Sequence, residues 1–176
     1  MMNRTCRISA LGMVSALGGG HVQTMENLLS ETPPKLVQGL ELVNNEIPFV
    51  GKVTVPLAEF PEQWNEYRCR NNALALTAYL QIEEQVQERI NTFGPFRIGV
   101  VLGTSTSGIA ATEQAVRVCR AEGEFPQAYD YAQHELNSVA DFIASYAGIT
   151  GPAYTISTAC SSSGKVFASG QALLEM

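Results

Sequence analysis

The sequence predicts an α/β layered domain that spans residues 1–176. Two short, nearly all-apolar runs, at 97–102 and 154–158, are typical of strands buried on both faces of a parallel sheet. Helical segments separate and follow these runs, and strands that alternate with helices indicate helices layered on a sheet. No strand follows the last helical segment, 160–176, so we expect a domain that is incomplete at its C-terminus.

The first half of the chain is predicted to be the less regular one. Residues 7–14 are typical of a strand that enters a glycine-rich turn, and residues 22–29 of a short helix. Most prolines fall in 31–66, which we interpret as a long excursion with short strand pieces around 49–55. The clearest helix is predicted over 71–90, because its apolar residues recur at helical spacing.

The second half is predicted to alternate regularly. A loop of small residues, 103–108, follows the first buried strand, and a helix is expected from about 109 to 121. Another helix is predicted over 133–147, closed by Gly148. The second buried strand then leads into the small-residue helix over 160–176.

Composition and charge argue against several classes of protein. Hydrophobic residues make up 45% of the chain and charged residues 16%, which is typical of a globular protein. The net charge of -6 disfavours nucleic acid as a partner, because phosphate binding needs a basic surface. No apolar run reaches the roughly 20 residues of a membrane span. The stretch 8–17 resembles a short signal peptide, but Gly12 breaks it, so we expect a cytoplasmic protein.

The four cysteines lie far apart in the chain. They form no CxxC pair, so the spacing of a metal site is absent, and reduced thiols are the simplest interpretation. We interpret Cys6, Cys69 and Cys119 as small apolar residues of a strand or of helices.

Cys160 is the candidate for chemistry. It follows the second buried strand and begins a helix, where unpaired backbone N–H groups and the helix dipole favour a thiolate. The same amides can stabilise a developing oxyanion, and small neighbours leave room for an acyl chain. Such a thiol is suited to acyl transfer. The residues alone leave the alternative that Cys160 is an inert buried cysteine.

Several motifs resemble the β-ketoacyl-acyl carrier protein synthases (ketosynthases) of the thiolase-like superfamily. TACSSS at 158–163 resembles their active-site motif, and ISALGMVSALG at 8–18 their opening strand, with Ala10 and Ala16 replacing the usual Gly and Pro. RIGVVLGTSTSG at 97–108 resembles their second central strand and its glycine-rich loop. Asn137, with the helix after it and GITGP at 148–152, resembles the segment before the nucleophile strand.

The resemblance implies a thiolase-like layered α/β/α fold, present here as its N-terminal half, and a decarboxylative Claisen condensation. Cys160 would take an acyl group from the phosphopantetheine arm of an acyl carrier protein, and its own backbone N–H would form part of the oxyanion hole. Malonyl-carrier protein would then lose CO₂ and attack the thioester. No cofactor is implied besides the phosphopantetheine that carries the substrates.

The resemblance also indicates what this sequence lacks. The family completes its site with two histidines, a lysine and a second oxyanion donor from the C-terminal half, and none of those motifs is found in this sequence. We interpret His21 and His134 as surface or capping residues. The isolated chain is therefore expected not to complete the condensation.

Three further residues are candidates for binding a partner or the substrate. Arg68 and Arg70 precede the long helix, where the family often places basic residues that dock the acidic carrier protein, although a solvated helix start is an equally simple interpretation. Thr106 lies in the GTSTSG loop, at a position that borders the acyl pocket in the family, or it is a loop residue without a selective role.

The resemblance implies partners as well. Family members dimerise through the strand at 154–158, so we expect a homodimer, or a heterodimer with another ketosynthase-like subunit. A fatty acid or a polyketide pathway is compatible with the motifs. Two alternatives stay open: a non-catalytic partner subunit of the chain-length-factor type, although such subunits usually lose the cysteine, and an inactive truncated fragment.

Overall fold

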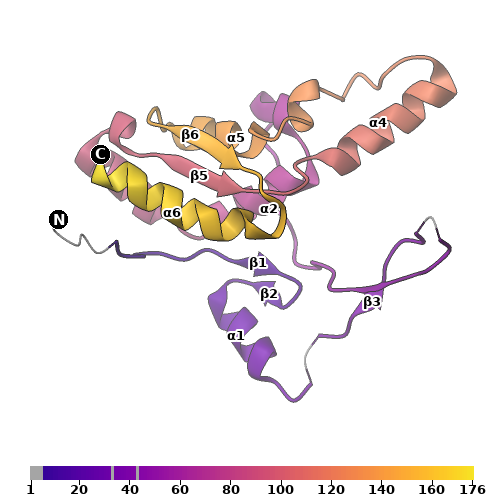
Figure 1. The fold of residues 1–176 in the computed structure, drawn as a ribbon, viewed down its shortest axis with the longest axis horizontal. Coiled ribbons are helices and arrows are strands. Elements are labelled where there is room, and N and C mark those ends of the chain that lie inside the picture. The colour runs from indigo at the N-terminus through magenta and orange to yellow at the C-terminus, as the bar shows by residue number, and fades with distance from the viewer. Residues whose placement is uncertain (1–5, 33, 43) are drawn as a thin grey trace.

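The computed structural model describes residues 6–32, 34–42 and 44–176. At its centre lie two parallel strands, β5 (Val100–Gly103) and β6 (Ala153–Ile156), with Val100 opposite Ala153 and Gly103 opposite Ile156. Helix α6 (Ser162–Glu175) covers one face of this pair and α5 (Ser138–Ala147) the other, with α2 (Arg70–Tyr79) packed on α5 (Figure 1). The predicted α/β layering is confirmed.

The hydrophobic core lies between the strands, α5 and α2. Helix α5 is buried on nearly all sides, because the strands lie on one side of it and α2 on the other. Phe142 is fully buried and stacks on Phe60, with 4.5 Å between ring centroids. Burying these side chains is the main driving force for the layered arrangement.

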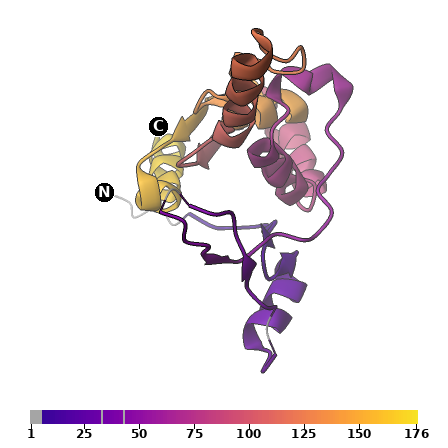
Figure 2. The same cartoon turned by 90° about the vertical axis from the view of Figure 1, so that its right-hand side faces the viewer.

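The N-terminal arm, the described residues of 6–55, extends from one side of this core and meets α2 at Gly12 and Met13 (Figures 1 and 2). It contains a hairpin of β1 (Val14–Ser15) and β2 (Gly18–Gly19), helix α1 (His21–Leu29), and the pair β3 (Val37–Gln38) and β4 (Phe49–Val50). The predicted helix over 22–29 and a strand piece near 49–55 are confirmed.

The predicted strand over 7–14 is mostly wrong. Only Val14 is in a strand, because the glycine turn folds β2 back on β1 immediately. Ile8 and Leu11 are exposed, and residues 6–13 form no ladder with any described strand.

The helix predicted over 71–90 is interrupted. It consists of α2 and α3 (Glu83–Phe93), separated at residues 80–82. The Gln81 side-chain amide donates to the Met13 carbonyl and accepts from the Met13 N–H, both at 3.0 Å. The N–H groups of Gln81 and Ile82 donate to carbonyls three residues earlier, as in a 3-10 turn, rather than four residues earlier. These turns end α2 where the N-terminal arm crosses it.

Other boundaries moved by a few residues. Helix α5 begins at Ser138 rather than at 133, because a 3-10 turn, η3 (Tyr131–Gln133), buries the Gln133 side chain against the Ala128 carbonyl. The short turns η1 (Glu62–Tyr67) and η2 (Pro95–Arg97) precede α2 and β5. Helix α4 (Ile109–Glu122) agrees with its prediction and extends away from the strands (Figure 1).

In the described part of the chain, no helix has the length and apolarity needed to cross a bilayer.

Candidate active site

Cys160 lies where the predicted strand ends and the predicted helix begins. Strand β6 ends at Ile156, a single 3-10 turn, η4 (Ala159–Ser161), contains the cysteine, and α6 starts at Ser162 (Figure 1). The predicted position of Cys160 is confirmed. Its side chain is exposed, so the alternative of a buried cysteine is wrong.

The backbone of this turn leaves donors free beside the thiol. Ala159 has a left-handed φ of 52°, which is uncommon for a residue with a Cβ. The N–H groups of Ala159 and Cys160 find no acceptor among the described residues. Two unpaired amides next to an exposed thiol are the elements that an oxyanion-stabilising acyl acceptor needs.

Strand β6, which precedes the Cys160 turn, is anchored from the start of α5. The Thr155 N–H donates to the Asn137 side-chain oxygen at 2.8 Å, and the Asn137 amide donates to Asp141 at 2.7 Å. Asn137 thus covers one backbone donor of β6 and fixes this strand relative to α5.

The loop of Thr106 begins beside the end of β6, since the Thr104 N–H donates to the Ile156 carbonyl at 3.2 Å. Buried Ser107 has a φ of 48° and donates to the Glu135 carbonyl at 2.6 Å, which holds the loop in shape. Thr106 itself is exposed and lines a cavity of about 230 Å³ that Cys160 does not line. The structure therefore brings the loop near the nucleophile strand but does not place Thr106 and Cys160 in one cavity.

Both arginines are exposed and hold the segment that leads into α2. The Arg68 guanidinium donates to the Phe60 carbonyl at 3.0 Å and lies 6.0 Å from the centroid of its ring. Arg70 donates to the Val53 carbonyl at 3.3 Å. Each arginine thus has a structural role that the sequence did not indicate.

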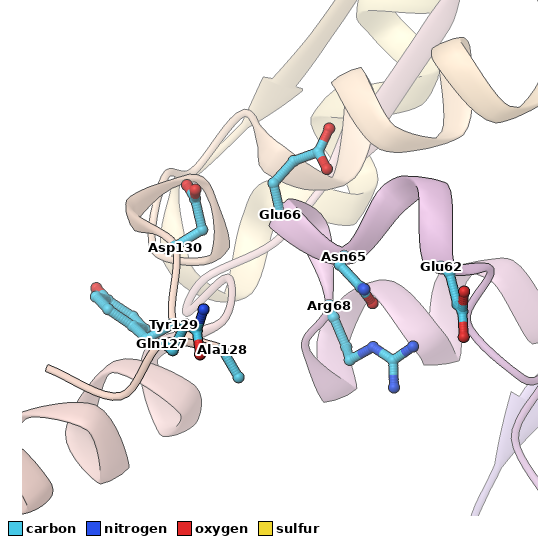
Figure 3. A pocket seen from close by; sticks show the side chains of 8 residues that line it. All are labelled: Glu62, Asn65, Glu66, Arg68, Gln127, Ala128, Tyr129 and Asp130. Carbon is cyan, nitrogen blue, oxygen red and sulfur yellow. The ribbon is translucent and has the colours of Figure 1, made fainter.

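Arg68 also lines a polar cavity of about 480 Å³ between η1 and the segment before η3 (Figure 3). Three carboxylates, those of Glu62, Glu66 and Asp130, line the same cavity. This charge balance repels phosphate, so the cavity itself does not favour a phosphopantetheine arm.

Neither histidine is hydrogen-bonded to Cys160. His21 is exposed at the first residue of α1, as predicted for a surface residue. His134 is half-buried at the end of η3, where its Nδ1 lies 3.1 Å from the Thr112 Oγ1.

The other three cysteines differ from one another. Cys69 is buried before α2, and burial raises the pKa of its thiol. Cys119 is half-buried in α4, whereas Cys6 is exposed outside any strand, so its interpretation as an apolar strand residue is wrong. Sequence reasoning also missed Ser162, because nothing in a run of three serines shows which one is buried.

Comparisons with known proteins agree with this fold. The family described as "Beta-ketoacyl synthase, N-terminal domain" matches residues 71–175. The fold is similar to a chain of a solved complex from Xenorhabdus doucetiae, that of the ketosynthase ApeO with its chain length factor ApeC, at a TM-score of 0.88 and 39% identity. That match covers 96% of this chain and 43% of the other, so this chain spans less than half the length of its relative. No curated protein matches the chain. With its thiolase-like α/β layers, the family match over residues 71–175 and the structural match over 96% of its length, the chain belongs to the β-ketoacyl synthase family.

Proposed function

We propose that this chain supplies the acyl-accepting part of a β-ketoacyl-acyl carrier protein synthase, with Cys160 as the nucleophile. The observation that carries the proposal is the exposed thiol in the β6–α6 turn, flanked by two backbone N–H groups without acceptors. A thiol in that setting can attack a thioester while the amides bind the oxyanion.

The first chemical step is a thioester exchange. The Cys160 thiolate attacks the carbonyl carbon of an acyl thioester on the phosphopantetheine of the carrier protein. A new C–S bond forms at Cys160, and the carrier's C–S bond breaks. The phosphopantetheine leaves as a thiolate and takes up a proton, which balances the proton that Cys160 released on ionisation.

The second step is the condensation. Malonyl-carrier protein loses CO₂, and the resulting carbanion attacks the acyl–Cys160 carbonyl. A C–C bond forms, the bond to Cys160 breaks, and the carrier holds a β-ketoacyl chain two carbons longer. The family promotes decarboxylation with groups from its C-terminal half, two histidines and a lysine, and none of those motifs is found in this sequence. We therefore expect the chain to accept acyl groups without condensing them.

Partners follow from the same proposal. The acyl carrier protein is the donor, acting in the cytoplasm in fatty acid or polyketide synthesis, and the guanidinium groups of Arg68 and Arg70 are candidates to dock its acidic surface. The complex of ApeO with its chain length factor supports a heterodimer with a ketosynthase-like subunit for this chain too. The cysteine at 160 favours the acyl-accepting subunit over the chain-length-factor type.

The test is acyl loading. The chain is incubated with an acyl-carrier protein and read by intact-mass and peptide mass spectrometry. We expect one acyl adduct, on Cys160, that Cys160→Ala abolishes and that Cys6→Ala, the matched change at another exposed cysteine, does not. With malonyl-carrier protein added, no β-ketoacyl product should accumulate. A folded chain that takes no acyl group, or takes it on Cys6, would contradict the proposal and favour a non-catalytic subunit.

A further inference from the structure

Ser162 is the buried member of the serine run that follows Cys160. Its side chain is 3% exposed, whereas those of Ser161 and Ser163 are exposed. The hydroxyl accepts the Thr158 N–H at 2.9 Å and donates to the Ala159 carbonyl at 2.7 Å. The first bond holds the Thr158 N–H, one residue before Ala159, and the second holds the carbonyl of the peptide that leads into Cys160.

The segment that this hydroxyl spans is conformationally unfavourable. Ala159 has a φ of 52°, and a residue with a Cβ keeps this conformation only where its surroundings impose it. The hydroxyl of Ser162 accepts a hydrogen bond from the Thr158 N–H, one residue before Ala159, and donates one to the carbonyl of Ala159 itself. Together with the Ser162 N–H, which donates to the same carbonyl, it therefore holds the Ala159–Cys160 peptide plane, which orients the free N–H group of Cys160. The Ala159 N–H lies in the preceding peptide plane, whose Thr158 carbonyl accepts from the Ser161 hydroxyl at 2.8 Å.

Ser162 is itself fixed by the first strand of the sheet. A Cβ at Gly103, the last residue of β5, would lie 3.0 Å from the Ser162 carbonyl carbon and 3.2 Å from its oxygen. The backbone of α6 thus starts in close contact with β5. This contact fixes the backbone that carries the Ser162 hydroxyl, whereas the Cys160 side chain remains exposed.

We propose that Ser162 is a positioning residue for acyl transfer, one that holds the Cys160 amide in the orientation that binds the oxyanion. The inference rests on the proposed function of Cys160 as the acyl acceptor. Ser162 touches no substrate in this role and acts only through the backbone of the turn.

The role separates two reactions of the same thiol. Alkylation by iodoacetamide needs a thiolate but no oxyanion site, whereas acyl transfer from a thioester needs both. We expect Ser162→Ala to lower the rate of Cys160 acylation on the order of 10-fold or more, as loss of oxyanion stabilisation does, and to leave alkylation of Cys160 nearly unchanged. Ser162→Thr, which keeps a hydroxyl, should restore part of the acylation rate, and Ser163→Ala is the matched control at an exposed serine.

A readout without activity tests the hydrogen bonds directly. The Thr158 amide is bonded to the Ser162 hydroxyl, so its hydrogen exchange, followed by NMR, should accelerate in Ser162→Ala and not in Ser163→Ala. Unchanged exchange, or acylation and alkylation that fall equally, would overturn the role of Ser162. An unaltered chain that never acylates would instead overturn the function proposed for Cys160, and the exchange data would still decide whether Ser162 holds the turn.

Discussion

At the scale of single residues, the four thiols experience different environments. Cys69 is 6% exposed, and burial raises the pKa of its thiol above the ordinary 9.0, so little thiolate forms there near neutral pH. Cys160 is exposed in the turn that precedes α6, beside backbone N–H groups without acceptors among the described residues. Cys6 is also exposed, which makes it the informative comparison.

We predict that cerulenin, a reagent that resembles the substrate, modifies Cys160 before Cys6 at pH 7.5, and that Cys69 stays unmodified in the folded chain. The reason is that Cys6 shares the exposure of Cys160 but has no turn with free amides beside it. Peptide mass spectrometry over a time course gives the order. Equal modification of Cys6 and Cys160 would show that the β6–α6 turn confers no special reactivity.

At the scale of elements, glycines mark where helices approach other backbone. Gly108 precedes α4, and a Cβ there would collide with the Gln133 carbonyl oxygen and lie 3.0 Å from the Cys69 Sγ. Gly170 lies inside α6 with no atom within 4 Å of an added Cβ. The two positions therefore respond oppositely to the same substitution.

Gly108→Ala should destabilise the fold by about 1–3 kcal/mol, because η3 or Cys69 must move to admit the methyl group. Gly170→Ala should stabilise it by about 0.5–1 kcal/mol, because alanine loses less backbone entropy in a helix. Urea unfolding of the two variants beside the unaltered chain measures both changes. Stabilisation by Gly108→Ala would mean that α4 does not pack against η3 as described.

At the scale of the whole molecule, the chain exposes much apolar surface. Its accessible area is 12291 Å², whereas a compact monomer of 19.0 kDa exposes roughly 8,400 Å². The N-terminal arm accounts for part of this excess, with Leu40 88% exposed and Leu29 75% exposed. Apolar surface of this extent favours association, since burying it releases free energy.

We therefore predict that the chain self-associates at tens of micromolar, a rough working range for a specific interface. The outer edge of β6 is one candidate surface, because β6 pairs only with β5 among the described strands, although Asn137 already occupies the Thr155 N–H. Light scattering over a concentration series measures the mass. A single monomeric species across that series would contradict the prediction.

The core also predicts how stability depends on alkaline pH. Burial raises the pKa of Tyr67, Tyr79 and Tyr146 above the ordinary 10.0, and for Tyr67 nearby carboxylates, Asp141 first, add to the effect. The unfolded chain thus releases these protons at lower pH than the folded chain does, so stability is complete below about pH 10 and falls above it. Thermal unfolding between pH 8 and 11 should show the loss, and Tyr67→Phe should reduce it. An unfolding temperature that does not change between pH 8 and 11 would contradict the burial of these three tyrosines.

Local sequence patterns determined the layered fold class, the strand before Cys160 and the helix after it. A few consecutive apolar residues are enough to indicate a buried strand, and a few small residues are enough to indicate close packing. They also determined α1 and α4 and the resemblance that the family match confirmed. Specific side-chain contacts, some of them between distant segments, decided the rest. The break between α2 and α3 depends on Gln81 meeting Met13, the late start of α5 on the buried Gln133, and the geometry of the Cys160 turn on Ser162 and Gly103. Gln81 and Met13, and likewise Gly103 and Ser162, lie together only after folding, and helical periodicity carries no information about a partner 68 residues away.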